Sequence, residues 1–75
     1  MSKDPRVRRG DVVIRRKPDT SVCDTVLVLT DNVLPDDHWL PRAYPEALTF
    51  ARRMTAQAWG RIWIIEADGT WSEAQ

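Results

Sequence analysis

Apolar residues occur in short runs separated by turn-forming residues, and these runs predict strands. Residues 11–17 and 24–30 are rich in β-branched residues and are separated by a segment of Pro, Asp, Thr and Ser, so we expect an antiparallel hairpin. A third β-branched and aromatic run, residues 61–66, predicts another strand. The Asp-Gly pair that follows favours a tight turn into a short last strand over residues 70–72.

One segment has the period of a helix instead. Between Pro45 and Gly60, alanine and larger apolar residues recur every three or four positions. Proline suits the first helical position, and glycine suits the left-handed residue that ends a helix. The elements therefore follow the order β-β-α-β, with a short further strand at the end. We predict an α+β fold, a small antiparallel sheet with one helix packed on a face.

Two further segments lack this regularity. Residues 1–10 hold four basic residues and no apolar period, so we predict a flexible basic arm followed by a single α+β domain over residues 11–75. Residues 31–45 contain three prolines and predict a loop across the surface. Large apolar side chains such as Trp39 would anchor that loop over the edge of the core.

The predicted strands are apolar on both faces. In the third strand, Ile62 and Ile64 project to one side while Trp63 and Ile65 project to the other. One helix covers only one side, so the other must be covered by the 31–45 loop, by a second copy of the chain or by another protein. We therefore expect a protein–protein interaction module that self-associates as a homodimer. Its candidate interaction surface is Leu27, Leu29, Trp39, Trp63 and Ile65.

The charges sum to zero but are segregated along the chain. Residues 1–17 carry seven basic residues and two acidic ones, whereas residues 18–46 carry six acidic residues and one basic one. Such segregation steers an anionic ligand to one end of a molecule, or pairs the two ends with each other. Together with the four tryptophans, the arginines support an alternative function, a small nucleic-acid-binding protein. Its candidate contacts are Arg6, Arg8, Arg9, Arg52, Arg53 and Arg61.

No residue pattern predicts catalysis, and we expect neither a metal nor a cofactor. Asp36, Asp37 and His38 are adjacent, but three neighbouring side chains rarely converge on one ion. Cys23 has only His38 to serve as its base and lacks a third group to orient that base, so we expect a half-buried structural thiol. The three glycines are isolated and form no phosphate-binding loop. We predict a protein that is not an enzyme.

Composition places the chain among folded globular proteins, with 43% hydrophobic and 29% charged residues. Its longest apolar runs are too short to cross a bilayer, and no apolar leader follows the N-terminal basic residues. A single cysteine forms no disulfide within the chain, which is typical of proteins in a reducing compartment. We therefore predict a cytoplasmic protein without membrane contact.

A combination of residue types between residues 44 and 71 carries a family resemblance. An aromatic residue, an acid and alanine open an arginine-bearing helix, glycine closes it, and an apolar strand ends in Asp-Gly. The matching residues are Tyr44, Glu46, Ala47, Ala51, Arg52, Gly60, Ile62, Ile64, Ile65, Asp68 and Gly69. This pattern resembles a family of small uncharacterised bacterial domains of unknown function, from which the long proline-rich segment 31–45 departs. The resemblance implies a fold and no activity.

Overall fold

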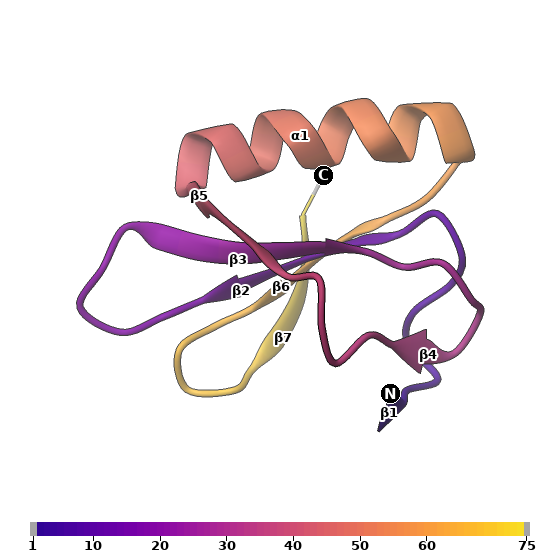
Figure 1. Ribbon diagram of the computed structural model, residues 1–75, viewed down its shortest axis with the longest axis horizontal. Coiled ribbons are helices and arrows are strands. Elements are labelled where there is room, and N and C mark those ends of the chain that lie inside the picture. Colours follow the sequence, from indigo (N-terminus) through magenta and orange to yellow (C-terminus); the bar gives the residue numbers. More distant parts are fainter. Residues whose placement is uncertain (1, 75) are drawn as a thin grey trace.

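A computed structural model describes residues 2–74 and shows one helix packed against a five-stranded sheet within that range (Figure 1). The sheet has the strand order β5-β3-β2-β6-β7. Its strands are β2 (Val12–Arg16), β3 (Val22–Leu27), β5 (Leu40–Ala43), β6 (Ile62–Ile65) and β7 (Trp71–Ala74). A separate two-stranded ribbon pairs β1 (Ser2–Lys3) with β4 (Val33–Leu34). The predicted α+β fold with one helix on a sheet is confirmed.

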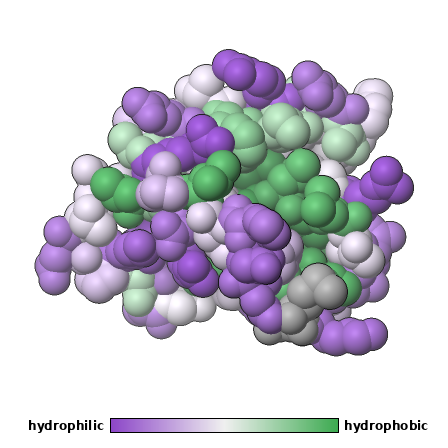
Figure 2. Space-filling model, in the orientation of Figure 1, coloured by the Kyte–Doolittle hydropathy of each residue, from purple (hydrophilic) through white to green (hydrophobic). Residues whose placement is uncertain are grey.

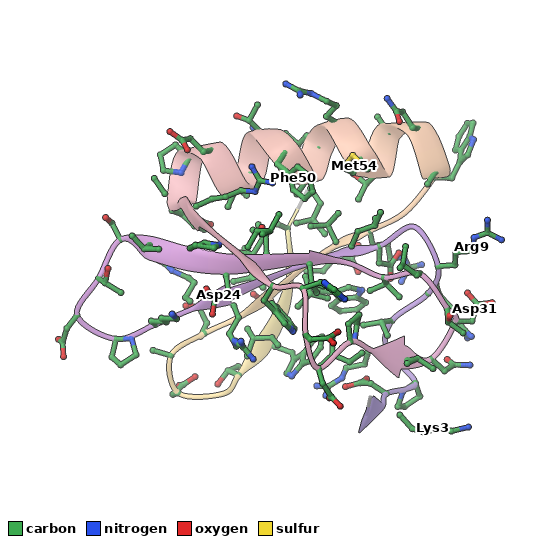
Figure 3. All side chains as sticks on the ribbon, viewed as in Figure 1. Lys3, Arg9, Asp24, Asp31, Phe50 and Met54 are labelled. Atoms are coloured by element: carbon green, nitrogen blue, oxygen red, sulfur yellow. The ribbon has the colours of Figure 1, made fainter. Side chains whose placement is uncertain are left out.

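Helix α1 (Tyr44–Ala58) begins and ends close to the predicted positions. Proline lies in its first turn, and the acidic residue of that turn is near the positive end of the helix dipole. The buried residues Ala47, Ala51 and Thr55 face the sheet, and their small size lets the helix approach it closely. Phe50 and Met54 pack on the same core and point from α1 toward the sheet (Figure 3).

The sheet is mixed, which corrects the expectation of an antiparallel sheet. β2 pairs with β3 antiparallel, as the predicted hairpin requires, but it pairs with β6 in parallel. β5 is antiparallel to β3, so β5 and β6 both run in the direction of β2. The helix between β5 and β6 explains this arrangement. A helical crossover returns the chain to the end of the sheet at which the preceding strand began, so the next strand runs in the same direction.

The second face of the sheet is covered by irregular segments of the same chain. Val7 is fully buried there, against Val13, Val26 and Val28 of the sheet layer, and Trp39 packs on the same cluster. The N-terminal segment is held by backbone hydrogen bonds, since Asn32 donates to the carbonyl oxygen of Val7 at 2.8 Å. The described part of the predicted flexible arm is thus held in place, because β1 pairs with β4 and Val7 packs against the sheet. It shares the cover of this face with the predicted loop.

The proline-rich segment 31–45 holds two short strands that the sequence did not predict. Residues of β5 pair with β3 at the edge of the sheet, and Pro41 lies opposite Asp24. An edge strand tolerates proline because one side of its backbone has no neighbouring strand to which it must donate. Prolines therefore do not exclude strands here, and pairing with β3 and β1 decides where β5 and β4 form.

Candidate nucleic-acid interface

Arginines from three distant segments meet at the C-terminal end of α1. The first hollow there has a volume of about 400 Å³, and its lining includes Arg6, Arg8, Arg9 and Arg61. A second hollow, of about 530 Å³, is lined by Arg52 and again by Arg61. Trp59 lines both hollows, so they adjoin, and we call them together the Trp59 surface. Figure 3 shows Arg9 at the same end of the molecule as the end of α1.

Arg53 does not join this group, although it is adjacent to Arg52 in the sequence. It lies on another side of α1, in a hollow that it shares with Arg42 and Phe50. Five of the six arginines assigned to nucleic acid from the sequence therefore line the Trp59 surface, and the sixth lies elsewhere. The helical period explains the separation, because successive residues point about 100° apart around a helix axis.

A buried carboxylate positions two of the arginine-bearing segments. Asp11 is 2% exposed, and its Oδ1 accepts a hydrogen bond from the backbone N–H of Arg61 at 2.8 Å. Its Oδ2 accepts from the backbone N–H of Arg8 at 2.9 Å and from the indole Nε1–H of Trp63 at 2.9 Å. These bonds join the N-terminal segment to the start of β6, fifty residues away in the sequence. Three donors also satisfy a charge that would otherwise be costly to bury.

The end of α1 approaches the N-terminal segment so closely that each of these two segments needs a glycine at the point of contact. A Cβ atom at Gly60 would collide with the carbonyl oxygen of Gly10, and one at Gly10 would lie 2.7 Å from the Cβ of Ala58. The left-handed residue at the helix end is not Gly60, as the sequence suggested, but Trp59, with φ 57° and ψ 29°. Gly60 is therefore required for close approach rather than for handedness.

Trp59 does not close the core and is 96% exposed. The other five aromatic rings have stacking partners. Arginine guanidinium groups lie over the rings of Trp39, Tyr44, Phe50 and Trp71, while Trp63 packs edge-on against Trp71 with centroids 6.1 Å apart. Within residues 2–74, Trp59 makes no such ring contact.

The Trp59 surface carries a surplus of positive charge. Five arginines line it against two carboxylates, and one of these, Asp11, is occupied by its three donors. Glu73 pairs with Arg61 at 3.7 Å. Arg6 pairs with Asp4 at 2.8 Å, and the guanidinium holds the pKa of that carboxyl below its ordinary value of 3.8.

Of the five arginines that line the surface, Arg8, Arg9 and Arg52 have guanidinium groups that pair with no carboxylate within residues 2–74. Only the backbone N–H groups of Arg8 and Arg9 donate to carboxylates, those of Asp11 and Asp31. Arg8 donates from its Nη1 to the neutral amide oxygen of Asn32 at 3.0 Å. Hydrogen bonding to an amide leaves the positive charge uncompensated. These guanidinium groups can therefore bind an anion without first breaking an ion pair.

The apolar residues assigned to an interaction surface do not lie on one surface. Trp39, Trp63 and Ile65 pack in the cluster on the second face of the sheet, whereas Leu27 packs toward the helix. Leu29 alone among them is largely exposed, at 69%.

A smaller apolar hollow adjoins Leu29. It has a volume of about 250 Å³, and its lining includes Leu29, Leu40, which is 54% exposed, and Phe50. We call it the Leu29 hollow. Figure 2 shows hydrophobic residues gathered beneath α1 on the face in view.

The residues considered for catalysis or metal binding form no reactive group. Cys23 is buried, and that burial raises the pKa of its thiol, so the thiolate is disfavoured. His38 and Asp37 approach each other at 3.6 Å, both strongly exposed. Over residues 2–74, no group of three His, Cys, Asp or Glu side chains is placed to hold a metal ion.

Two residues central to this surface escaped the sequence analysis. From the sequence, Asp11 is an ordinary residue at the start of a strand. Trp59, at the end of an amphipathic helix, is expected to be a core aromatic residue. The one available signal was the position of Trp59 directly before Gly60, where a helix ends and side chains turn outward. Nothing in the sequence distinguishes Asp11 from an exposed aspartate.

Comparisons with protein-family models, with curated proteins and with solved structures gave no significant match. The resemblance of residues 44–71 to a family of small bacterial domains therefore stays a prediction. Within residues 2–74, the structure contains no helix with the length and hydropathy needed to span a membrane.

Proposed function

We propose that the chain is a non-enzymatic nucleic-acid-binding module that uses the Trp59 surface. The observation that carries the proposal is the convergence of Arg8, Arg9 and Arg52, from two distant segments, on one surface where their guanidinium groups pair with no carboxylate of residues 2–74. A nucleic-acid backbone carries a negative charge on every phosphate, so several guanidinium groups on one surface can each bind a phosphate of the same strand. A net charge of zero does not oppose this function, because the local charge of the surface steers a ligand.

A salt titration with matched arginine variants tests this function. Fluorescence anisotropy of a labelled oligonucleotide would follow binding by the wild-type chain, by R52A and by R53A. Because only Arg52 lines the surface, R52A should weaken binding and lower the slope of log affinity against log salt by about 0.7 on a single strand. R53A, its neighbour on the same helix, should leave both unchanged. Absence of binding at low salt by the wild-type chain would overturn the proposal.

A second candidate function is association between copies of the chain through the Leu29 hollow. Exposed Leu29 and Leu40 favour it, since large apolar groups around a hollow commonly mark interfaces. The pairing of β3 with β5 ends at Thr25, although β3 continues to Leu27, so the strand edge beside the hollow has no neighbouring strand. An uncovered edge of this kind is a template for pairing with a second copy about a two-fold axis. A homodimer, a protein partner and a cytoplasmic location otherwise stay predictions.

Sedimentation equilibrium separates this second candidate from the first. The wild-type chain should sediment with the mass of a dimer, and L29S and L40S should shift it toward the monomer. Both positions are already exposed, so these changes leave the fold intact. A wild-type chain that shows only monomer mass at high concentration excludes self-association and leaves nucleic-acid binding unaffected.

A further inference from the structure

Trp59 occupies a position where tryptophan is unfavourable for folding. Its backbone is left-handed, at φ 57°, a conformation in which a side chain crowds the backbone and for which glycine is the ordinary residue. Its side chain is 96% exposed and buries almost no apolar surface in return. The next residue is glycine, yet that glycine does not take the left-handed position. A stability role therefore does not account for the indole.

The environment of Trp59 differs from that of every other aromatic residue in the chain. Each of the other rings contacts an arginine guanidinium or a second ring, but the Trp59 indole meets no such group within residues 2–74. The two hollows that Trp59 lines are also lined by arginines. An open aromatic face between cations fits a ligand that is both flat and anionic, which is the chemistry of a nucleotide.

We infer that Trp59 stacks an unpaired base, so that the site takes single-stranded nucleic acid in preference to a duplex. This inference rests on the proposed function. In a duplex the base faces are covered by neighbouring bases, whereas in a single strand they can be splayed out onto an aromatic side chain. Arg8 and Arg9 in one hollow and Arg52 in the other would then hold the phosphates before and after the stacked base.

A strand fits the surface better than a free nucleotide. The two hollows have volumes of about 400 and 530 Å³, and both are lined by Trp59 and Arg61. One mononucleotide would occupy one hollow and leave unused either Arg52 or the pair Arg8 and Arg9. A chain of nucleotides places phosphates in both hollows around a single stacked base, and therefore uses Arg8, Arg9 and Arg52 together.

The test compares W59G and W59F with the wild-type chain on four ligands: a single-stranded oligonucleotide, its duplex, a mononucleotide and inorganic polyphosphate. The wild-type chain should bind the single strand more tightly than the duplex and the mononucleotide. W59G should weaken single-strand binding by about tenfold or more and leave polyphosphate binding unchanged, because base stacking on an aromatic side chain is lost. W59F should retain most of the affinity. Binding should quench indole fluorescence in the wild-type chain and less in W59F.

The outcomes separate this inference from the proposed function. If R52A loses affinity while W59G binds the single strand as tightly as the wild type does, base stacking is excluded and nucleic-acid binding stands. Equal affinity for single strand and duplex also overturns the inference. Preference for the mononucleotide would assign the site to a free nucleotide and overturn the strand. If the wild-type chain binds none of the ligands, both proposals fail. A lower melting temperature of W59G together with an equal loss of single-strand and polyphosphate binding would show that the indole acts through the fold and would overturn the inference.

Discussion

The two faces of the sheet are covered in different ways. Helix α1 covers one face with small residues, Ala47 and Ala51, at fully buried positions. Irregular segments cover the other, where Val7 and Trp39 fill the space above β2 and β3. The helix is held mainly by apolar packing along its length, whereas the irregular cover depends on hydrogen bonds to particular carboxylates, Asp4 and Asp11. The stability of the helix cover, α1, therefore depends on side-chain volume. The stability of the irregular cover, the segments that hold Val7 and Trp39, depends on polar partners.

Loss of the Asp11 carboxylate should be the largest perturbation of the irregular cover. In D11A, the N–H groups of Arg8, Arg61 and Trp63 lose their acceptor, so the free energy of unfolding should fall by about 3 kcal/mol. Urea denaturation measures this change. D37A removes an exposed carboxylate and serves as the control. A fall of less than about 1 kcal/mol in D11A would show that the irregular cover does not depend on this residue.

On the sheet face that α1 covers, stability should depend on the volume of the buried side chains. A51L adds three carbon atoms at a fully buried contact, and overpacking should lower the free energy of unfolding by about 2 kcal/mol. The matched control is A56L, because Ala56 is exposed on the same helix and its replacement should change stability by less than about 0.5 kcal/mol. Thermal unfolding of the three chains makes the comparison. Equal stability of A51L and A56L would contradict close packing of α1 on the sheet.

At the end of α1, where the helix meets the N-terminal segment, a substitution should raise the free energy of unfolding rather than lower it. W59G replaces a left-handed tryptophan with the residue that this conformation suits, so the free energy of unfolding should rise by about 1 kcal/mol. By contrast, G60A should destabilise the chain, since a Cβ there meets the carbonyl oxygen of Gly10. Urea denaturation of both variants measures the difference. Destabilisation by W59G would show that the indole supports the helix end.

The smallest effect expected is the pH dependence that Asp4 adds to the irregular cover. Its hydrogen bonds from Arg6 lower the pKa of the carboxyl in the folded chain below the ordinary 3.8. A lowered carboxyl pKa stabilises the fold at pH values above the unfolded pKa, and this contribution is lost as the pH falls through the folded pKa. The stability difference between the wild type and D4N should therefore be present at neutral pH, below about 1 kcal/mol because Arg6 is partly exposed, and shrink in acid. Urea denaturation at both pH values measures it, and a difference that grows in acid would contradict this sign.

Local patterns predicted the regular elements because those patterns reflect neighbours along the chain. The three-to-four-residue period of small and apolar residues located α1, and the β-branched runs located β2, β3 and β6. Prolines misled the prediction at β5, because Pro41 is acceptable only at an edge that the sequence does not reveal. The parallel pairing of β2 with β6 was missed as well, since it follows from the path of the chain over the sheet.

The sequence predicted most of the arginines of the candidate site but not their arrangement. The arginines were selected by charge, but charge does not tell that Arg52 meets Arg61 at the Trp59 surface while Arg53 lies on another side of the helix. The apolar surplus of the strands was also real, yet most of it is covered within the chain, by residues that carried no apolar period. An irregular segment packs through individual side chains, so it leaves no periodic signal.

The sequence by itself therefore determined the helix, four of the strands and the two-sided apolar sheet, the last strand being predicted over residues 70–72 and found as β7 at Trp71–Ala74. Each of these depends on the spacing of residue types over a few positions. Only the tertiary structure decided which segments cover the second face and where the arginines meet. Those outcomes depend on contacts such as the bond from Arg61 to Asp11, which joins residues fifty positions apart. A single buried carboxylate and two closely approaching glycines set this geometry, and neither is visible until the chain has folded around them.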